Sequence, residues 1–232
     1  MAVSFAACST DQLEASISPL SPSSILLRLR LETRDEHNAV ERVLDLMSAA
    51  LTSDGYRQRL AQFYGFYAPF EKKLEKKLKD HDDLQPCAGH TPSPPPGTRA
   101  ALASRLNKTA LLQLDLQHLG VNTDELPLCH KLPLAETQAD ILGCLYVMEG
   151  ATLGGRLITR HVQTTLGITP ATGCSFFDGY GDHTGTMWQG MRQLLVNAAV
   201  DPATENRMVV SAIATFTCLR QWCQANHPQT TT

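Results

Sequence analysis

Apolar residues recur every three or four positions along most of the chain, the spacing typical of helices that bury one face. The first such run begins at Ile25 and includes Leu27, Leu31, Val40, Val43, Leu44 and Met47. It predicts a helix that ends near Leu51, before the turn-forming residues 53–55. Thr33 followed by Glu36 resembles a capping box, so we expect a short lead-in to break before the main helix.

Similar patterns predict the later helices over residues 56–79, 98–119 and 135–166, then from Thr184 or Thr186, and finally from Pro202 to about Ala225. Pro69 is expected to kink the first of these. No stretch alternates with a period of two, and no internal repeat is present. The fold class is therefore all-α, with seven or eight helices in one multi-helix bundle.

The segments outside these helices give the expected domain boundaries and connections. Residues 1–24 are rich in Ser, Ala and Pro and are expected to form a loosely ordered N-terminal arm. Residues 25–226 form the predicted domain, and 227–232 a short tail. The proline-rich stretch 85–97 is expected to lack regular structure. Gly120 and Gly167 are expected to stop helices.

Composition narrows the class of protein. The chain has 232 residues, 43% of them hydrophobic, and a formal net charge of -3, which suits one soluble domain and argues against a nucleic-acid partner. No apolar run approaches the roughly 18 residues of a membrane span, and no secretory signal is visible, so we expect a cytoplasmic protein. The seven cysteines include no CxxC and indicate free thiols rather than a zinc site.

Three glycines fall within one amphipathic, helix-forming run. Residues 142–156 read LGCLYVMEGATLGGR and contain Gly150, Gly154 and Gly155. Each helix-interior glycine costs roughly 0.5–1 kcal/mol relative to alanine, so the three form a local defect of about 2–3 kcal/mol. A helix keeps such a defect where its backbone bends, or where a flat and bulky group lies against it.

A histidine far upstream shares a helix face with a carboxylate. His37 and Glu41 lie four residues apart, and the phase set by Val40 and Leu44 turns His37 toward the buried face. An inward imidazole needs a hydrogen-bond partner or a metal, and Glu41 can accept a hydrogen bond from its ring. A histidine on one helix and a glycine-opened second helix suggest a sandwich around a planar cofactor.

These two segments carry a resemblance to a known family. TRDEHNAVE, around His37, and LYVMEGATLGG, around the glycines, resemble the haem oxygenases, especially the bacterial type associated with phytochrome chromophore synthesis. FFDGYG and TGTMW, later in the chain, add to the resemblance, which covers about residues 29–225. It implies a haem-oxygenase-like bundle, with haem between a proximal helix and a glycine-kinked distal helix.

The resemblance also implies which residues hold the haem. His37 is expected to be the proximal ligand of the haem iron, with Glu41 as the acceptor beside it. Side chains expected to bind the haem propionates are Arg30, or Arg28 if the register shifts, together with Tyr180 and Arg192. Arginine suits this role because it pairs with carboxylates in a fixed geometry.

The distal side shows one departure from the family pattern. The implied distal segment comprises Gly150, Ala151, Gly154 and Gly155, whose backbone would direct O2 to a meso carbon of the porphyrin. Animal-type members carry an aspartate at the position of Ala151, where it holds the water that protonates bound oxygen. Here the proton relay would depend on ordered water or on another side chain, such as Arg156.

The implied reaction uses haem b as both substrate and cofactor. Three oxygenation stages with O2 would give biliverdin, ferrous iron and carbon monoxide. No flavin or nucleotide motif is visible, so a ferredoxin or a flavoprotein reductase is the implied electron donor. A bacterial phytochrome that accepts biliverdin is the implied downstream partner.

Two other functions stay open at this point. A non-catalytic haem-binding sensor or carrier on the same fold would account for the apolar residue at Ala151. A helical enzyme of similar topology, such as a thiamin-degrading hydrolase, would need a nucleophilic cysteine in a pocket and would not explain His37 together with the glycine helix.

Overall fold

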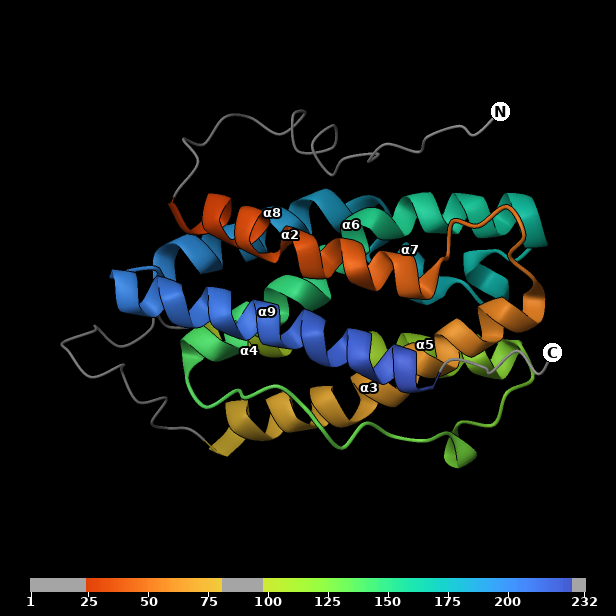
Figure 1. The fold of residues 1–232 in the computed structure, drawn as a ribbon, viewed down its shortest axis with the longest axis horizontal. Helices are drawn as coiled ribbons and strands as arrows, with labels where there is room; N and C mark the ends of the chain where they lie inside the picture. The colour runs from red at the N-terminus through yellow and green to blue at the C-terminus, as the bar shows by residue number, and fades with distance from the viewer. Residues whose placement is uncertain (1–23, 81–97, 227–232) are drawn as a thin grey trace.

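The computed structural model of this chain describes residues 24–80 and 98–226, which form a bundle of α-helices (Figure 1). The α-helices are α2 (Ser24–Leu44), α3 (Ser53–Asp80), α4 (Thr98–Ala103), α5 (Lys108–His118), α6 (Gln138–Leu166), α7 (Ser175–Asp178), α8 (Thr184–Ala198) and α9 (Pro202–Ala225). Three short 3-10 helices join them: η1 (Thr123–Glu125), η2 (Pro170–Thr172) and η3 (Gly181–His183). These described residues contain no strand, which confirms the all-α class.

Several predicted segments lie outside the described residues. They are the N-terminal arm up to residue 23, the whole of the proline-rich connection at 85–97, and the tail at 227–232. Residue 24, which was assigned to the arm, is the first residue of α2. The starts of α8 at Thr184 and of α9 at Pro202 agree with the sequence, as does the end of α9 at Ala225.

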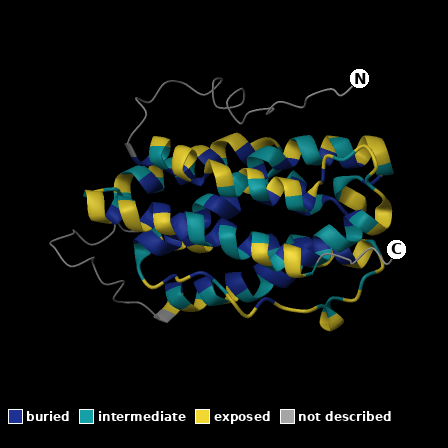
Figure 2. Ribbon diagram, in the orientation of Figure 1, coloured by how far each residue is buried: buried dark blue, intermediate teal, exposed yellow. Residues whose placement is uncertain are grey.

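Helix α9 contacts three of the other long helices, α2, α3 and α6. It packs along both α6 and α2, while α3 packs against α5 and α9. Figure 1 shows α2 and α6 at one level of the molecule, with α9 and α3 below them. Buried residues line the inward faces of these helices, so the core runs the length of the bundle (Figure 2).

The longest helix, α6, is the central element of this core. Its start is fixed by a reciprocal capping box between Thr137 and Asp140, and its end by Gly167 in the left-handed conformation. Contrary to the expectation from sequence, α6 is long and apolar enough to resemble a membrane span. Most of that apolar stretch is buried inside the bundle, as in the core helix of a folded domain.

A glycine that the sequence analysis did not single out sets how closely α6 meets α9. A Cβ added at Gly143 would collide with the backbone carbonyl of Met208 and would lie 2.9 Å from the Cβ of Ser211. The two helix backbones therefore approach each other more closely than any side chain at this position would permit.

The first helix differs from its prediction at two points. It runs unbroken from Ser24 to Leu44, because Thr33 is buried and its hydroxyl donates to the Leu29 carbonyl, one turn back, instead of capping a new helix. The helix ends at Leu44 rather than near Leu51, because Asp45 takes a positive φ of 43° that helical geometry excludes.

The predicted helix over residues 98–119 is divided into α4 and α5. Residues 104–107 leave the helical path between them, and Arg105 and Lys108 turn toward α6. The Glu71 carboxylate accepts the backbone N–H groups of Lys108 and Thr109, so a side chain of α3 supplies the N-terminal cap of α5. The predicted stop after this segment is correct, since Gly120 has a φ of +74°.

The Asp140 carboxylate provides a test of how α6 is anchored. Burial raises the pKa of this carboxyl, but hydrogen bonds from Arg207 and Thr137 outweigh burial and hold the pKa below its usual range. The folded-state pKa is thus lower than the unfolded value of about 3.9, so the stabilisation is present above that pH and is lost as pH falls through the folded-state pKa.

We therefore expect Asp140→Asn to lower the free energy of unfolding at pH 7 by about 1–2 kcal/mol. Urea unfolding between roughly pH 2 and pH 7 measures this, and the variant should lose less stability than the wild type on acidification. Parallel pH profiles for the two proteins would show that Asp140 does not anchor α6 through its charge.

Candidate functional site

His37 lies at the edge of the bundle, on α2. Its side chain is 44% exposed, so it is not turned fully inward as the sequence suggested. The ring contacts Phe216 of α9 edge-on, with centroids 5.6 Å apart, and its Nδ1 lies 3.7 Å from Glu41 Oε2. These two neighbours contact the imidazole from α2 and from α9, while nearly half of the side chain stays exposed.

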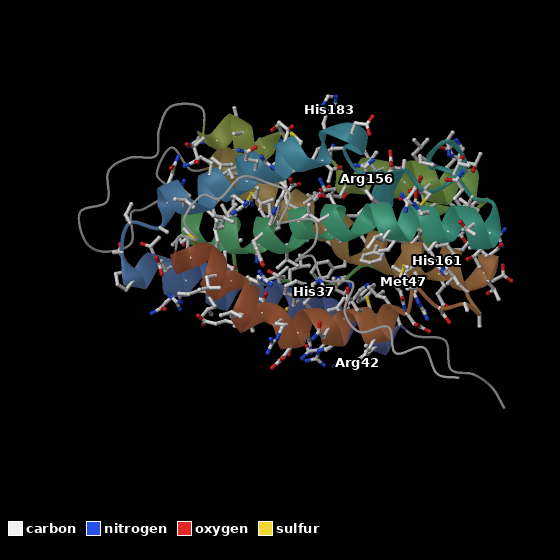
Figure 3. All side chains as sticks on the ribbon, turned by 90° about the horizontal axis from the view of Figure 1, so that it is seen from above. His37, Arg42, Met47, Arg156, His161 and His183 are labelled. Atoms are coloured by element: carbon white, nitrogen blue, oxygen red, sulfur yellow. The ribbon has the colours of Figure 1, made fainter. Side chains whose placement is uncertain are left out.

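Figure 3 shows His37 on the side of α2 that faces α6, while Arg42 projects from the opposite side. The two helices lie next to each other in this view and in Figure 1. At the far end of α2, His161 of α6 lies 3.0 Å from the Ser48 carbonyl, which ties α6 to the turn between α2 and α3.

Two of the predicted distal glycines open one face of α6. A Cβ added at Gly150 or at Gly154 would meet nothing within 4 Å. The two glycines are four residues apart and so lie on the same face of the helix. The helix itself continues through them, from Gln138 to Leu166, without a break. These glycines leave bare backbone beside open space.

The third glycine has a different role from the one predicted. A Cβ at Gly155 would collide with the backbone carbonyl of Phe177, so this glycine lets α7 approach α6 closely. Ala151, at which the resemblance implies an aspartate in animal-type members, is exposed. The structure therefore separates Gly155 from the open face formed by Gly150 and Gly154.

The residues predicted to bind propionates are spread over several elements. Arg30 is exposed on α2, and Arg192 is half-buried on α8. Arg28, the alternative to Arg30, pairs with Glu32 and Glu205. The Tyr180 hydroxyl donates to the buried Glu149 carboxylate and accepts from Lys108, so it is committed to protein partners rather than available to a propionate.

Arg156 does not lie where a distal proton relay would need it. Its guanidinium is exposed and lies 3.4 Å from Asp182. In Figure 3 it projects from α6 away from His37, toward His183. The suggestion that Arg156 replaces the missing aspartate is therefore wrong.

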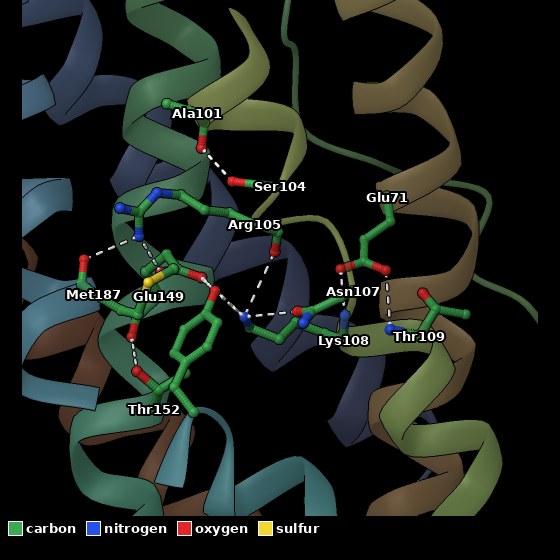
Figure 4. A network of polar contacts seen from close by, with 11 residues as sticks. Glu71, Ala101, Ser104, Arg105, Asn107, Lys108, Thr109, Glu149, Thr152 and Met187 are labelled. Atoms are coloured by element: carbon green, nitrogen blue, oxygen red, sulfur yellow. Dashed lines mark hydrogen bonds and ion pairs between the residues drawn. The ribbon is translucent and has the colours of Figure 1, made fainter. Parts of the chain in front are cut away.

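A buried charge cluster that the sequence analysis missed lies beside the open glycines (Figure 4). Glu149 of α6 has a side chain only 1% exposed, and its two oxygens lie 2.5 Å from Arg105 Nη1 and 2.8 Å from Lys108 Nζ. Arg105 also donates to the Met187 carbonyl of α8. The cluster thus links α6 to the α4–α5 connection and to α8.

Tyr180 and Glu71 complete this cluster. The Lys108 ammonium lies 2.9 Å from the Tyr180 hydroxyl and 4.3 Å from the centre of its ring. Burial, together with the Glu149 carboxylate, raises the pKa of Tyr180 well above its usual range, so the phenol keeps its proton. With Glu71 at the backbone of Lys108, two carboxylates balance two cations in the protein interior.

The sequence did hold one signal for this cluster. Glu149 is the sole charged residue in the run from Ile141 to Leu153, and a buried carboxylate requires cationic partners. The partners themselves, Arg105 and Lys108, lie in a segment predicted to be one regular helix, so nothing in the local pattern indicated them.

Comparison with known proteins assigns the family. The family model described as Heme oxygenase matches residues 23–225, so the chain belongs to the heme oxygenase family. Members of this family are enzymes that degrade haem, and the fold class and enzyme class inferred from the resemblance are both confirmed. A comparison with curated protein sequences gave no match.

Solved structures with a similar fold come from several bacteria. The heme oxygenase from Neisseria meningitidis, in NO- and CO-bound forms, is 17% identical and superposes with a TM-score of 0.65, covering 87% of this chain and 91% of that one. The heme oxygenase from Leptospira interrogans is 19% identical, with a TM-score of 0.65 over 88% of this chain and 100% of that one.

A cyanobacterial structure gives a third comparison. The heme oxygenase-2 from Synechocystis sp. PCC 6803, in complex with heme and NO, is 19% identical, with a TM-score of 0.63 over 88% of this chain and 85% of that one. At these identities the superpositions establish the shared fold, and the roles of individual residues must be argued from this chain.

The different surroundings of the adjacent glycines predict opposite effects of alanine. Gly154→Ala should raise the free energy of unfolding by about 0.5–1 kcal/mol, because the methyl group enters open space and alanine favours the helix. Gly155→Ala should lower it by about 1–3 kcal/mol, because the methyl group collides with the α7 backbone. Urea unfolding of both apo variants measures the difference. Equal effects of the two substitutions would contradict the conclusion that Gly154 faces open space while Gly155 faces α7.

Proposed function

We propose that this enzyme cleaves haem b with O2 to biliverdin, ferrous iron and carbon monoxide. The observation that carries the proposal is the pairing of an accessible imidazole on α2 with a side-chain-free face on the neighbouring α6. A flat macrocycle needs a slot of this kind, in which one face meets a ligating nitrogen and the other meets backbone.

The residues on the α2 side fit haem as a substrate. His37 has its Nδ1 beside Glu41 and its ring edge on Phe216, so its remaining nitrogen is oriented for ligation. A nearby carboxylate that fixes an imidazole also strengthens it as a donor. We assign His37 as the proximal ligand and Glu41 as the acceptor that orients it.

The residues on the α6 side would shape the oxygen-binding face. Bound haem supplies the site for O2 and the oxidisable meso carbons. Gly150 and Gly154 would let backbone approach this face closely, and Ala151 would add no carboxylate beside it. Ordered water held by backbone carbonyls would then carry the protons. Arg30 and Arg192 are the proposed partners of the propionates.

The reaction also implies partners. Electrons would come from a ferredoxin or a flavoprotein reductase, because the sequence carries no flavin or nucleotide motif. Delivery of biliverdin to a bacterial phytochrome, in the cytoplasm, is proposed from the resemblance of the His37 and glycine segments to the phytochrome-associated type.

The direct test is a single turnover. Purified protein is mixed with one equivalent of hemin, and its visible spectrum is followed in air after addition of ascorbate. The proposal expects the Soret band to give way to the broad red absorption of biliverdin, confirmed by extraction. A Soret band that survives the reductant would instead indicate a haem-binding sensor or carrier. The apolar residue at Ala151 would then explain why the protein binds haem without cleaving it.

His37→Ala tests the proximal assignment. We expect hemin still to bind between α2 and α6, but the spectrum of histidine-ligated haem should be lost and should return when imidazole is added. His183→Ala is the matched control, because His183 is exposed on η3 and should leave the spectrum unchanged. A wild-type Soret band in His37→Ala without imidazole would overturn the assignment.

A further inference from the structure

The contacts around residues 149–155 leave α6 free on one face only. Gly150 and Gly154 line the open face. At about 100° per residue, Glu149 lies roughly 120° from the midline of that face in one direction, and Gly155 roughly 120° in the other. Glu149 meets Arg105 and Lys108, and Gly155 meets the backbone of α7.

The side opposite the open face is also held. Thr152 is buried, its hydroxyl donates to the Glu149 carbonyl, and its side chain lies 3.4 Å from the Cβ position of Gly179, just after α7. This contact and the Gly155 contact are steric, so each of them blocks movement in one direction. The ion pairs of Glu149 are directional, and they fix a rotation of the helix.

We propose that Glu149 is a positioning residue that holds α6 at the rotation at which Gly150 and Gly154 face α2. The proposed function supplies the purpose of this rotation, which is to present bare backbone to the haem. The restraint itself is a property of the apo protein. Tyr180, whose hydroxyl donates to Glu149 at 2.8 Å, closes the cluster from the α7 side.

The energetics favour a positioning role over simple stabilisation. Burying two carboxylates and two cations incurs a desolvation cost that their attraction only partly repays, so an apolar core here would be about as stable. An apolar contact would not fix the rotation of α6, because it permits small slips of one side chain past another. The ion pairs of Glu149 favour one geometry, since a rotation of α6 would leave a buried charge unpaired.

Hydrogen exchange of the apo protein tests this proposal. In Glu149→Gln, which keeps the shape and removes the charge, the amides of residues 150–155 should exchange at least about tenfold faster relative to the amides of residues 208–219 in α9. Tenfold corresponds to about 1.4 kcal/mol of local opening. Equal acceleration in both segments, or none in residues 150–155, would overturn the proposal.

Asp140→Asn is the matched control. Asp140 also pairs a carboxylate of α6 with an arginine, but it does so at the start of the helix and far from the glycines. This variant should destabilise the protein without selectively exposing residues 150–155. If it accelerates exchange there as much as Glu149→Gln does, the effect belongs to α6 as a whole and the proposal fails.

A second variant distinguishes two consequences of Glu149→Gln: the unpaired cation that it leaves behind, and the loss of the ion pairs that hold α6. Glu149→Gln combined with Lys108→Met removes one charge of each sign, so it should regain global stability relative to Glu149→Gln alone. The proposal expects exchange in residues 150–155 to stay fast in this double variant. A return to the wild-type rate would show that an unpaired cation, and not the missing anchor, had loosened the helix.

A hemin titration of the same variants distinguishes this proposal from the proposed function. Glu149→Gln should bind hemin more weakly than the wild type, while Asp140→Asn should bind it with wild-type affinity. If the wild type itself does not bind hemin, the proposed function fails, and the exchange data still decide whether Glu149 positions α6.

Discussion

The structure depends on a single constraint placed on α6: its backbone must be held firmly by neighbours while one of its faces carries no side chains. Gly150 and Gly154 remove side chains from that face and would leave an isolated helix weakened. Packing on the other faces offsets this defect, through Gly143 against α9 and Gly155 against α7. The glycines of one helix therefore serve two opposite purposes, close packing and open space.

The α2 side meets a complementary constraint. His37 must be oriented and yet remain accessible, and the structure achieves this by placing it at the edge of the bundle between Phe216 and Glu41. Because α9 packs along both α2 and α6, it fixes the spacing between the histidine and the glycines. The relative placement of His37 and the two glycines is thus a property of the three helices together, because α9 contacts both α2 and α6.

The sequence predicted those features that follow from local periodicity and capping. The helical class, the starts of α8 and α9 and the left-handed Gly167 were all recognisable, because each depends on residues close together in the chain. The break between α4 and α5 was not, because Arg105 and Lys108 leave the helix to reach Glu149, 44 and 41 residues away. Likewise, Gly154 and Gly155 have identical local propensity, and their different roles arise from what lies opposite each of them.

The central claim is that haem lies between His37 and the Gly150–Gly154 face of α6. A crystal structure of the protein loaded with hemin tests it most directly. The account predicts His37 Nε2 within bonding distance of the iron, with the backbone of Gly150 and Gly154 facing the opposite side of the porphyrin. Iron bonded to another residue, or haem bound away from α6, would contradict it.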